Sequence, residues 1–247
     1  MDLPSVETLI VLALITAAAY AVYGLTGFGN VVIAMPLMLI FLPLYIAAPV
    51  AMLHGLFAGS TVGIAERRHA NLRELGYLLP FVLIGQTVGT TLLIHVAEKY
   101  LLFVLGMFLI GYSGWRLLAN PAEKPLARAW ALPLGVVGGI FSALFGTGGV
   151  IFTVFLTRRI ADKQVLRATN NLMVLLAAIS RGLLLLSTGF FSRLQVWQLT
   201  VLLLPFVFVG LYAGNHLHSR ASTQRVMQAI WLILIAAGAN LIRQGSM

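Results

Sequence analysis

The 247-residue chain contains no cysteine and only seven acidic residues. The absence of cysteine excludes disulfide bonds, thiolate metal sites and cysteine nucleophiles. The acidic residues lie near the N-terminus, in expected loops or at loop edges, so no pair of carboxylates is placed for acid–base catalysis inside an apolar segment. A zinc site is not expected either, because His216 and His218 have no third ligand nearby. The sequence therefore indicates a protein that is not an enzyme and that has no cofactor.

Charged residues of both signs make up only 9% of the chain, whereas a soluble domain carries about 25%. Hydrophobic residues make up 60%, and the mean hydropathy is +0.97. A chain of this composition cannot cover a surface that faces water. Because a spanning helix needs about 20 apolar residues, the length predicts roughly seven to nine passes through a bilayer.

The net charge of +9 does not indicate nucleic-acid binding. The basic residues form short clusters between apolar runs, as Lys and Arg do in cytoplasmic loops. No basic stripe is interleaved with aromatic residues, as a nucleic-acid groove requires. We therefore expect the lipid bilayer, and no nucleic acid, as a partner.

Eight apolar stretches follow one another, at residues 9–44, 46–65, 75–96, 100–118, 130–156, 166–186, 196–217 and 226–242. Backbone groups in hydrocarbon must be paired within the chain, so these stretches are predicted to be helices or pieces of helices. The first is broken by a glycine-rich segment at residues 24–30 and the fifth by another at residues 146–149. The predicted fold is all-α: one polytopic membrane helix bundle that forms a single transmembrane domain over residues 1–247.

An internal repeat divides this domain. Residues 27–31 (GFGNV) match residues 146–150 (GTGGV), and residues 80–89 (PFVLIGQTVG) match residues 205–214 (PFVFVGLYAG). We place the first repeat at about residues 7–118 and the second at about 130–243, with a cytoplasmic loop at about 119–129 between them.

Four basic clusters, at residues 67–73, 116–128, 158–167 and 220–225, separate the stretches. The positive-inside rule assigns all four to the cytoplasm. Eight simple passes cannot achieve this, because the second and third clusters flank a single stretch. If each broken stretch enters and leaves the membrane on the same side, all four clusters share one side. Each repeat then has one glycine-broken helix or re-entrant hairpin plus three spanning helices, and the second repeat is inverted. Eight plain spans in two parallel repeats are the alternative.

The two glycine-rich breaks are the first candidate for a binding site. A helix that starts inside the membrane presents unpaired N–H groups and a positive dipole end, which bind anions without a charged side chain. The alternative is that the glycines only permit close helix packing. The candidate residues are Gly27, Gly29, Asn30, Gly146, Thr147, Gly148 and Gly149.

Four polar residues in apolar stretches are further candidates. Thr169 and Asn170 offer donors for an oxyanion, although a helix N-cap with interhelical hydrogen bonds explains them equally well. Arg181 could complement an anion, because a charge at membrane depth is costly; snorkelling to the interface is the alternative. His54 could carry a coupling proton, and a histidine that simply bonds between helices is the alternative. We interpret Gln86 as a residue that holds packed helices together by interhelical hydrogen bonds.

These residues resemble the TauE/SafE family of sulfite exporters. The resemblance is carried by residues 24–29 (GLTGFG), 48–50 (APV), 66–73 (ERRHANLR) and 80–89, and by the glycines at 146–149 and residues 168–170 (ATN) in the second half. Two positions depart from the family pattern: Asn30 replaces an expected glycine, and Pro49 stands where the second repeat has Thr169. From the family we carry over only Gly27, Gly29, Gly146, Gly148, Gly149, Thr169 and Asn170.

The resemblance implies transport of small sulfur-containing anions, such as sulfite, sulfoacetate or similar organosulfonates, in the bacterial inner membrane. Because no ATP-binding motif is present, we expect a secondary transporter driven by an ion gradient. A passive anion channel and a non-transporting membrane scaffold are the alternatives. The expected partners are the small anion and the bilayer, and a homodimer is an option that the sequence leaves open.

Overall fold

The computed structural model describes residues 4–26, 29–118, 125–217 and 223–246. Within these ranges the chain is helical and has no strand, which confirms the predicted all-α class. The α-helices are α1 (Val6–Thr26), α2 (Asn30–Met38), α3 (Leu44–Glu66), α4 (Leu72–His95), α5 (Glu98–Leu118), α6 (Ala131–Phe145), α7 (Gly148–Thr157), α8 (Lys163–Leu186), α9 (Leu194–Leu217) and α10 (Thr223–Gly245). Short 3₁₀-helices η1 (Arg67–His69), η2 (Arg128–Trp130) and η3 (Phe190–Ser192) connect some of them.

Six segments of the described chain are long and apolar enough to cross a membrane. They are Val6–Leu25, Leu72–His95, Glu98–Leu118, Arg128–Phe145, Lys163–Leu186 and Leu194–His216. Two shorter apolar helical segments, Leu44–Ser60 and Gly148–Thr157, lie among them. The composition of the sequence is therefore matched by helices of membrane-spanning length.

Each glycine-broken stretch forms two helices rather than one. α2 has 9 residues and α7 has 10, so at 1.5 Å per residue each is about 15 Å long, half of the hydrocarbon core. Gly29, before α2, has φ of 92°, and Gly146, after α6, has φ of 73°. L-residues with a side chain rarely adopt these left-handed angles, so glycine is needed where the chain turns.

The two ends of the bundle differ in charge. At one end, which we call the basic end, the carboxylate of Glu74 accepts hydrogen bonds from Arg159 Nε (3.1 Å) and Nη2 (2.7 Å). Arg128 Nη2 lies 3.6 Å from the same carboxylate. Arg73 is the neighbour of Glu74 in the chain, so residues from three of the four basic clusters lie together at this end. The side chains of the fourth, at residues 220–225, lie outside the described part.

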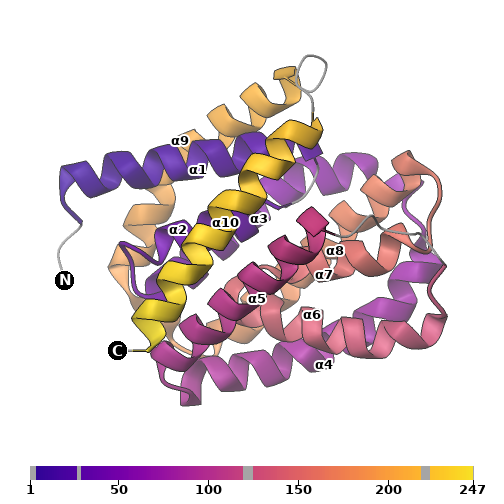
Figure 1. Cartoon of the computed structure of the whole chain (residues 1–247), viewed down its shortest axis with the longest axis horizontal. Coiled ribbons are helices and arrows are strands. Elements are labelled where there is room, and N and C mark those ends of the chain that lie inside the picture. Colours follow the sequence, from indigo (N-terminus) through magenta and orange to yellow (C-terminus); the bar gives the residue numbers. More distant parts are fainter. Residues whose placement is uncertain (1–3, 27–28, 119–124, 218–222, 247) are drawn as a thin grey trace.

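The opposite end, which we call the Glu98 end, is held by contacts of a different kind. Glu98 Oε1 accepts a hydrogen bond from the backbone N–H of Leu44 at 2.6 Å. The guanidinium of Arg193 lies 4.1 Å from the centre of the Tyr45 ring. Gly245, near the C-terminus, packs on the backbone of Lys99. The start of α1 and the end of α10 lie on the same side of the bundle (Figure 1).

The Pro-to-Gly motif is the matching segment at residues 80–89 and 205–214, and both copies pack on the first helix of a broken pair. Gly85 of α4 lies against the backbone of Val136 in α6, and a Cβ at residue 85 would collide with it. Gly210 and Gly214 of α9 meet the backbone of Ala17 and Ala21 in α1 in the same way. Figure 1 shows the α4–α6 pair and the α1–α9 pair on opposite edges of the bundle.

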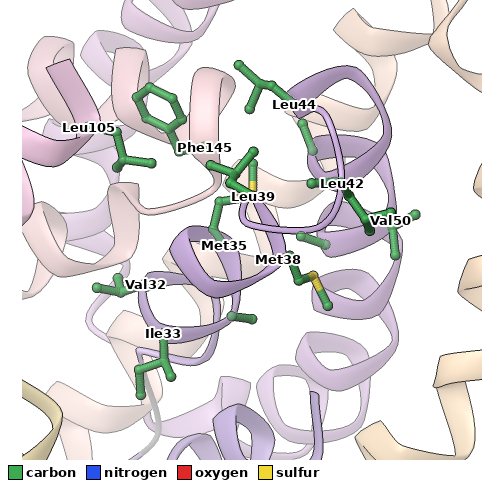
Figure 2. Close-up of a cluster of buried hydrophobic side chains, with 14 of the residues drawn as sticks. Val32, Ile33, Met35, Met38, Leu39, Leu42, Leu44, Val50, Leu105 and Phe145 are labelled. Carbon is green, nitrogen blue, oxygen red and sulfur yellow. The ribbon is translucent and has the colours of Figure 1, made fainter. Parts of the chain in front are cut away.

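Figure 2 shows a cluster of buried hydrophobic side chains where α2 leads into α3. Met35, Met38, Leu42 and Leu44 are at most 4% exposed, and Phe145 at the end of α6 is completely buried. Since α2 runs from its glycine turn to the Glu98 end, this core closes the bundle between the glycine turns and that end.

Candidate functional site

The two glycine turns meet around one cavity in the interior of the bundle. Gly146 lies against Val31 and Arg181: a Cβ at residue 146 would be 2.8 Å from Val31 Cγ1 and 2.7 Å from Arg181 Nη1. The volume of the cavity is about 50 Å³. Its polar side chains are Tyr23, Asn30, Ser142, Thr147 and Arg181, and the rest of its wall consists of glycine and apolar residues.

Among the residues that the structure describes, Arg181 of α8 is the only charged side chain in the wall of this cavity. It is 2% exposed. Its Nη2 donates to the carbonyl oxygen of Ala48 at 3.3 Å, and its Nε has no hydrogen-bond partner among the described residues. Both ion pairs found in the described part of the chain are made by Glu74, at the basic end. A buried cation without a carboxylate partner is costly, so an anion that enters the cavity relieves the cost.

The starts of α2 and α7 add backbone N–H groups to the wall. Neither Gly29 nor Thr147 caps its helix with a side-chain hydrogen bond. Asn30, Val31 and Val32 line the cavity in the first turn of α2, before Ile33 N makes a helical hydrogen bond to Gly29 O at 3.2 Å. The positive ends of two helix dipoles thus point at the space beside Arg181.

The hydroxyl of Thr147 is also available to a ligand. Thr147 is completely buried, and its Oγ1 has no hydrogen-bond partner among the described residues. A buried hydroxyl without a partner is costly in a native fold. Thr147 therefore provides a second unsatisfied polar group in the cavity wall, next to Gly146 in the chain.

Gln86 of α4 joins three helices behind the cavity. Its Nε2 donates to Ala177 O (2.7 Å) and to Ser142 Oγ (3.2 Å), and its Oε1 accepts from Ser180 Oγ (2.6 Å). Ser180 precedes Arg181 on α8, so this network fixes the helix turn that carries the guanidinium. The sequence did not identify Ser142 as a site residue; its signal is a serine four positions before the Gly146 turn.

The structure does not gather every candidate residue at the cavity. Gly29, Asn30, Gly146, Thr147, Gly149 and Arg181 line it. Gly148 instead packs on the backbone of Gly138 in α6. Gly27 lies outside the described residues.

Thr169, Asn170 and His54 have partners elsewhere. Thr169 Oγ1 donates to Val165 O (2.6 Å) and accepts from Asn71 N (2.8 Å) near the basic end. Asn170 Oδ1 accepts from Thr153 Oγ1 at 3.0 Å. His54 Nε2 lies 3.1 Å from Thr200 O, and its Nδ1 has no hydrogen-bond partner within the described ranges.

Comparison with known proteins identifies the family to which this chain is similar. The family model described as "Sulfite exporter TauE/SafE" matches residues 12–241. A curated protein, "Probable inner membrane transporter protein TsaS" of Comamonas testosteroni, is 28% identical over 195 residues, which cover 78% of each chain. No solved structure shows significant similarity.

Proposed function

The chain belongs to the TauE/SafE sulfite exporter family, and from that premise we propose that it is a secondary transporter of small sulfur-containing anions. Sulfite, sulfoacetate and similar organosulfonates are the proposed cargo. The protein is a multi-pass inner-membrane protein, as the six membrane-length segments of its described part and the name of its relative indicate.

The observation that supports this proposal best is the buried guanidinium of Arg181 in the cavity wall. A unit charge about 4 Å from a guanidinium gains about 4 kcal/mol at an effective dielectric constant of 20. One hydrogen bond to a charged group contributes about 1.5–3 kcal/mol. We therefore assign most of the anion affinity to Arg181, and orientation of the anion to Thr147 and the first turns of α2 and α7.

The size of the cavity favours the smallest members of this substrate class. A water molecule needs about 10–15 Å³ of cavity volume, so the 50 Å³ cavity holds about four non-hydrogen atoms. Sulfite has this number of non-hydrogen atoms. Sulfoacetate is larger, and its binding requires the walls of the cavity to move apart.

We further propose that the two halves are inverted repeats. Two observations support this: each Pro-to-Gly motif packs on the first helix of the other half's broken pair, and α6–α7 begins and ends near the basic end. The excess of Lys and Arg assigns the basic end to the cytoplasm. Alternating access would then be a movement of the two halves around Arg181.

Counterflow in proteoliposomes tests the proposal. The reconstituted protein should exchange labelled sulfite in a saturable way, and Arg181→Ala should abolish this exchange. Arg243→Ala is the matched control, because Arg243 is an exposed arginine in the last turn of α10. A linear, voltage-driven current would favour the channel alternative, and the absence of any flux would favour the scaffold.

A further inference from the structure

Gln86 fixes the hydrogen-bonding role of Ser142. Gln86 is completely buried, and its amide lies between Ala177 O, Ser142 Oγ and Ser180 Oγ. A carbonyl oxygen can only accept, so the amide nitrogen must face Ala177. Ser142 Oγ, on the same nitrogen, therefore accepts the second amide hydrogen and keeps its own hydrogen for another partner.

The remaining hydrogen of Ser142 has no acceptor in the described part of the protein. Ser142 is 6% exposed and lines the cavity together with Thr147 and Arg181. These three side chains offer a serine O–H, a threonine O–H and a guanidinium N–H. No aspartate or glutamate with a described side chain lines the cavity.

We propose that Ser142, oriented by Gln86, is a specificity-determining residue that donates a hydrogen bond to the bound oxyanion. The same set of donors, with no carboxylate beside it, rejects sulfonates that carry an ammonium group. An ammonium in this cavity has no acidic partner and is repelled by Arg181. This inference rests on the proposed function and narrows its substrate class to oxyanions without a positive charge.

Two competing sulfonates of similar size test whether the cavity rejects a ligand that carries a positive charge. Isethionate and taurine differ in having a hydroxyl or an ammonium at the same carbon. In wild-type proteoliposomes, isethionate should inhibit labelled sulfite uptake at a concentration at least about tenfold lower than taurine, because burial of an unpaired charge is costly. Equal inhibition by both, or inhibition by neither, would overturn the charge selection, since the cavity would then select by size alone.

Ser142→Ala tests the donor, with Ser113→Ala as its matched control. Ser113 on α5 is completely buried, and its Oγ has no hydrogen-bond partner in the described ranges, but it does not line the cavity. Ser142→Ala should raise the sulfite concentration for half-maximal uptake about tenfold or more. Its melting temperature should fall below that of the wild type, because the buried Gln86 amide loses an acceptor. Ser113→Ala should leave uptake unchanged. Equal uptake by the two variants would overturn the role of Ser142, and a wild-type protein that takes up no sulfur anion would remove the proposed function as well.

Discussion

Gly146→Ala should impair both the fold and the binding of anions. Residue 146 has φ of 73°, and an L-residue in this region costs about 1–2 kcal/mol. The new Cβ would also lie 2.7 Å from Arg181 Nη1, so the guanidinium must move by about 1 Å to reach an ordinary contact distance. At an effective dielectric constant of 20, lengthening an ion pair from about 4 to about 5 Å removes about 0.8 kcal/mol of attraction. We therefore expect about a fourfold loss of sulfite affinity in addition to the loss of stability.

Gly189→Ala separates the two effects of this substitution. Gly189 has φ of 74°, but a Cβ there would meet nothing within 4 Å. Thermal unfolding in detergent should show a loss of stability in both variants, because both place alanine at a left-handed angle. The loss should be larger in Gly146→Ala, because its Cβ also lies too close to Val31 and Arg181. Sulfite uptake in proteoliposomes should change its half-maximal concentration only in Gly146→Ala. If both variants had the wild-type value, or if both lost affinity equally, the proposed contact between residue 146 and the substrate-binding arginine would be refuted.

Two further predictions concern helix packing and energy coupling. Gly85→Ala should lower the melting temperature by several degrees, because its Cβ collides with the backbone of Val136. Gly76→Ala on the same helix is the control: its Cβ has nothing within 4 Å, so the variant should be neutral or slightly stabilised. Equal melting temperatures of the two variants would contradict the close contact of α4 and α6. His54→Gln should retain sulfite counterflow but lose acceleration by a pH gradient, because the imidazole is the proposed proton carrier; an unchanged response to the gradient would remove His54 from coupling.

The helices and their two breaks were predictable because their signals are local. Eight apolar runs separated by basic or turn segments define the helices, and the clusters around Gly29 and Gly146 define where two of these runs break. The structure adds the reason: both glycines adopt left-handed angles at a turn inside the bundle.

The composition of the cavity wall was only partly predictable. Arg181 lies near the end of an apolar run, so the sequence allowed its guanidinium to snorkel to the interface; in the structure it is buried against Ala48, a residue 133 positions away. Ser142, Gln86 and Ser180 come together across 56 and 94 positions, and no local pattern encodes such a meeting. Thr169 makes a hydrogen bond within α8 and one to Asn71, as the alternative to an oxyanion site predicted, but Asp162 and not Thr169 caps the helix.

Equilibrium binding of labelled sulfite to the purified protein tests the central role of Arg181 most directly. With the Coulomb attraction of about 4 kcal/mol removed, Arg181→Ala should bind sulfite about 10²–10³-fold more weakly than the wild type. Arg243→Ala, which removes the same charge from an exposed position, should bind as the wild type does. Equal affinity of the wild type and Arg181→Ala for sulfite, with both proteins folded, would contradict the account.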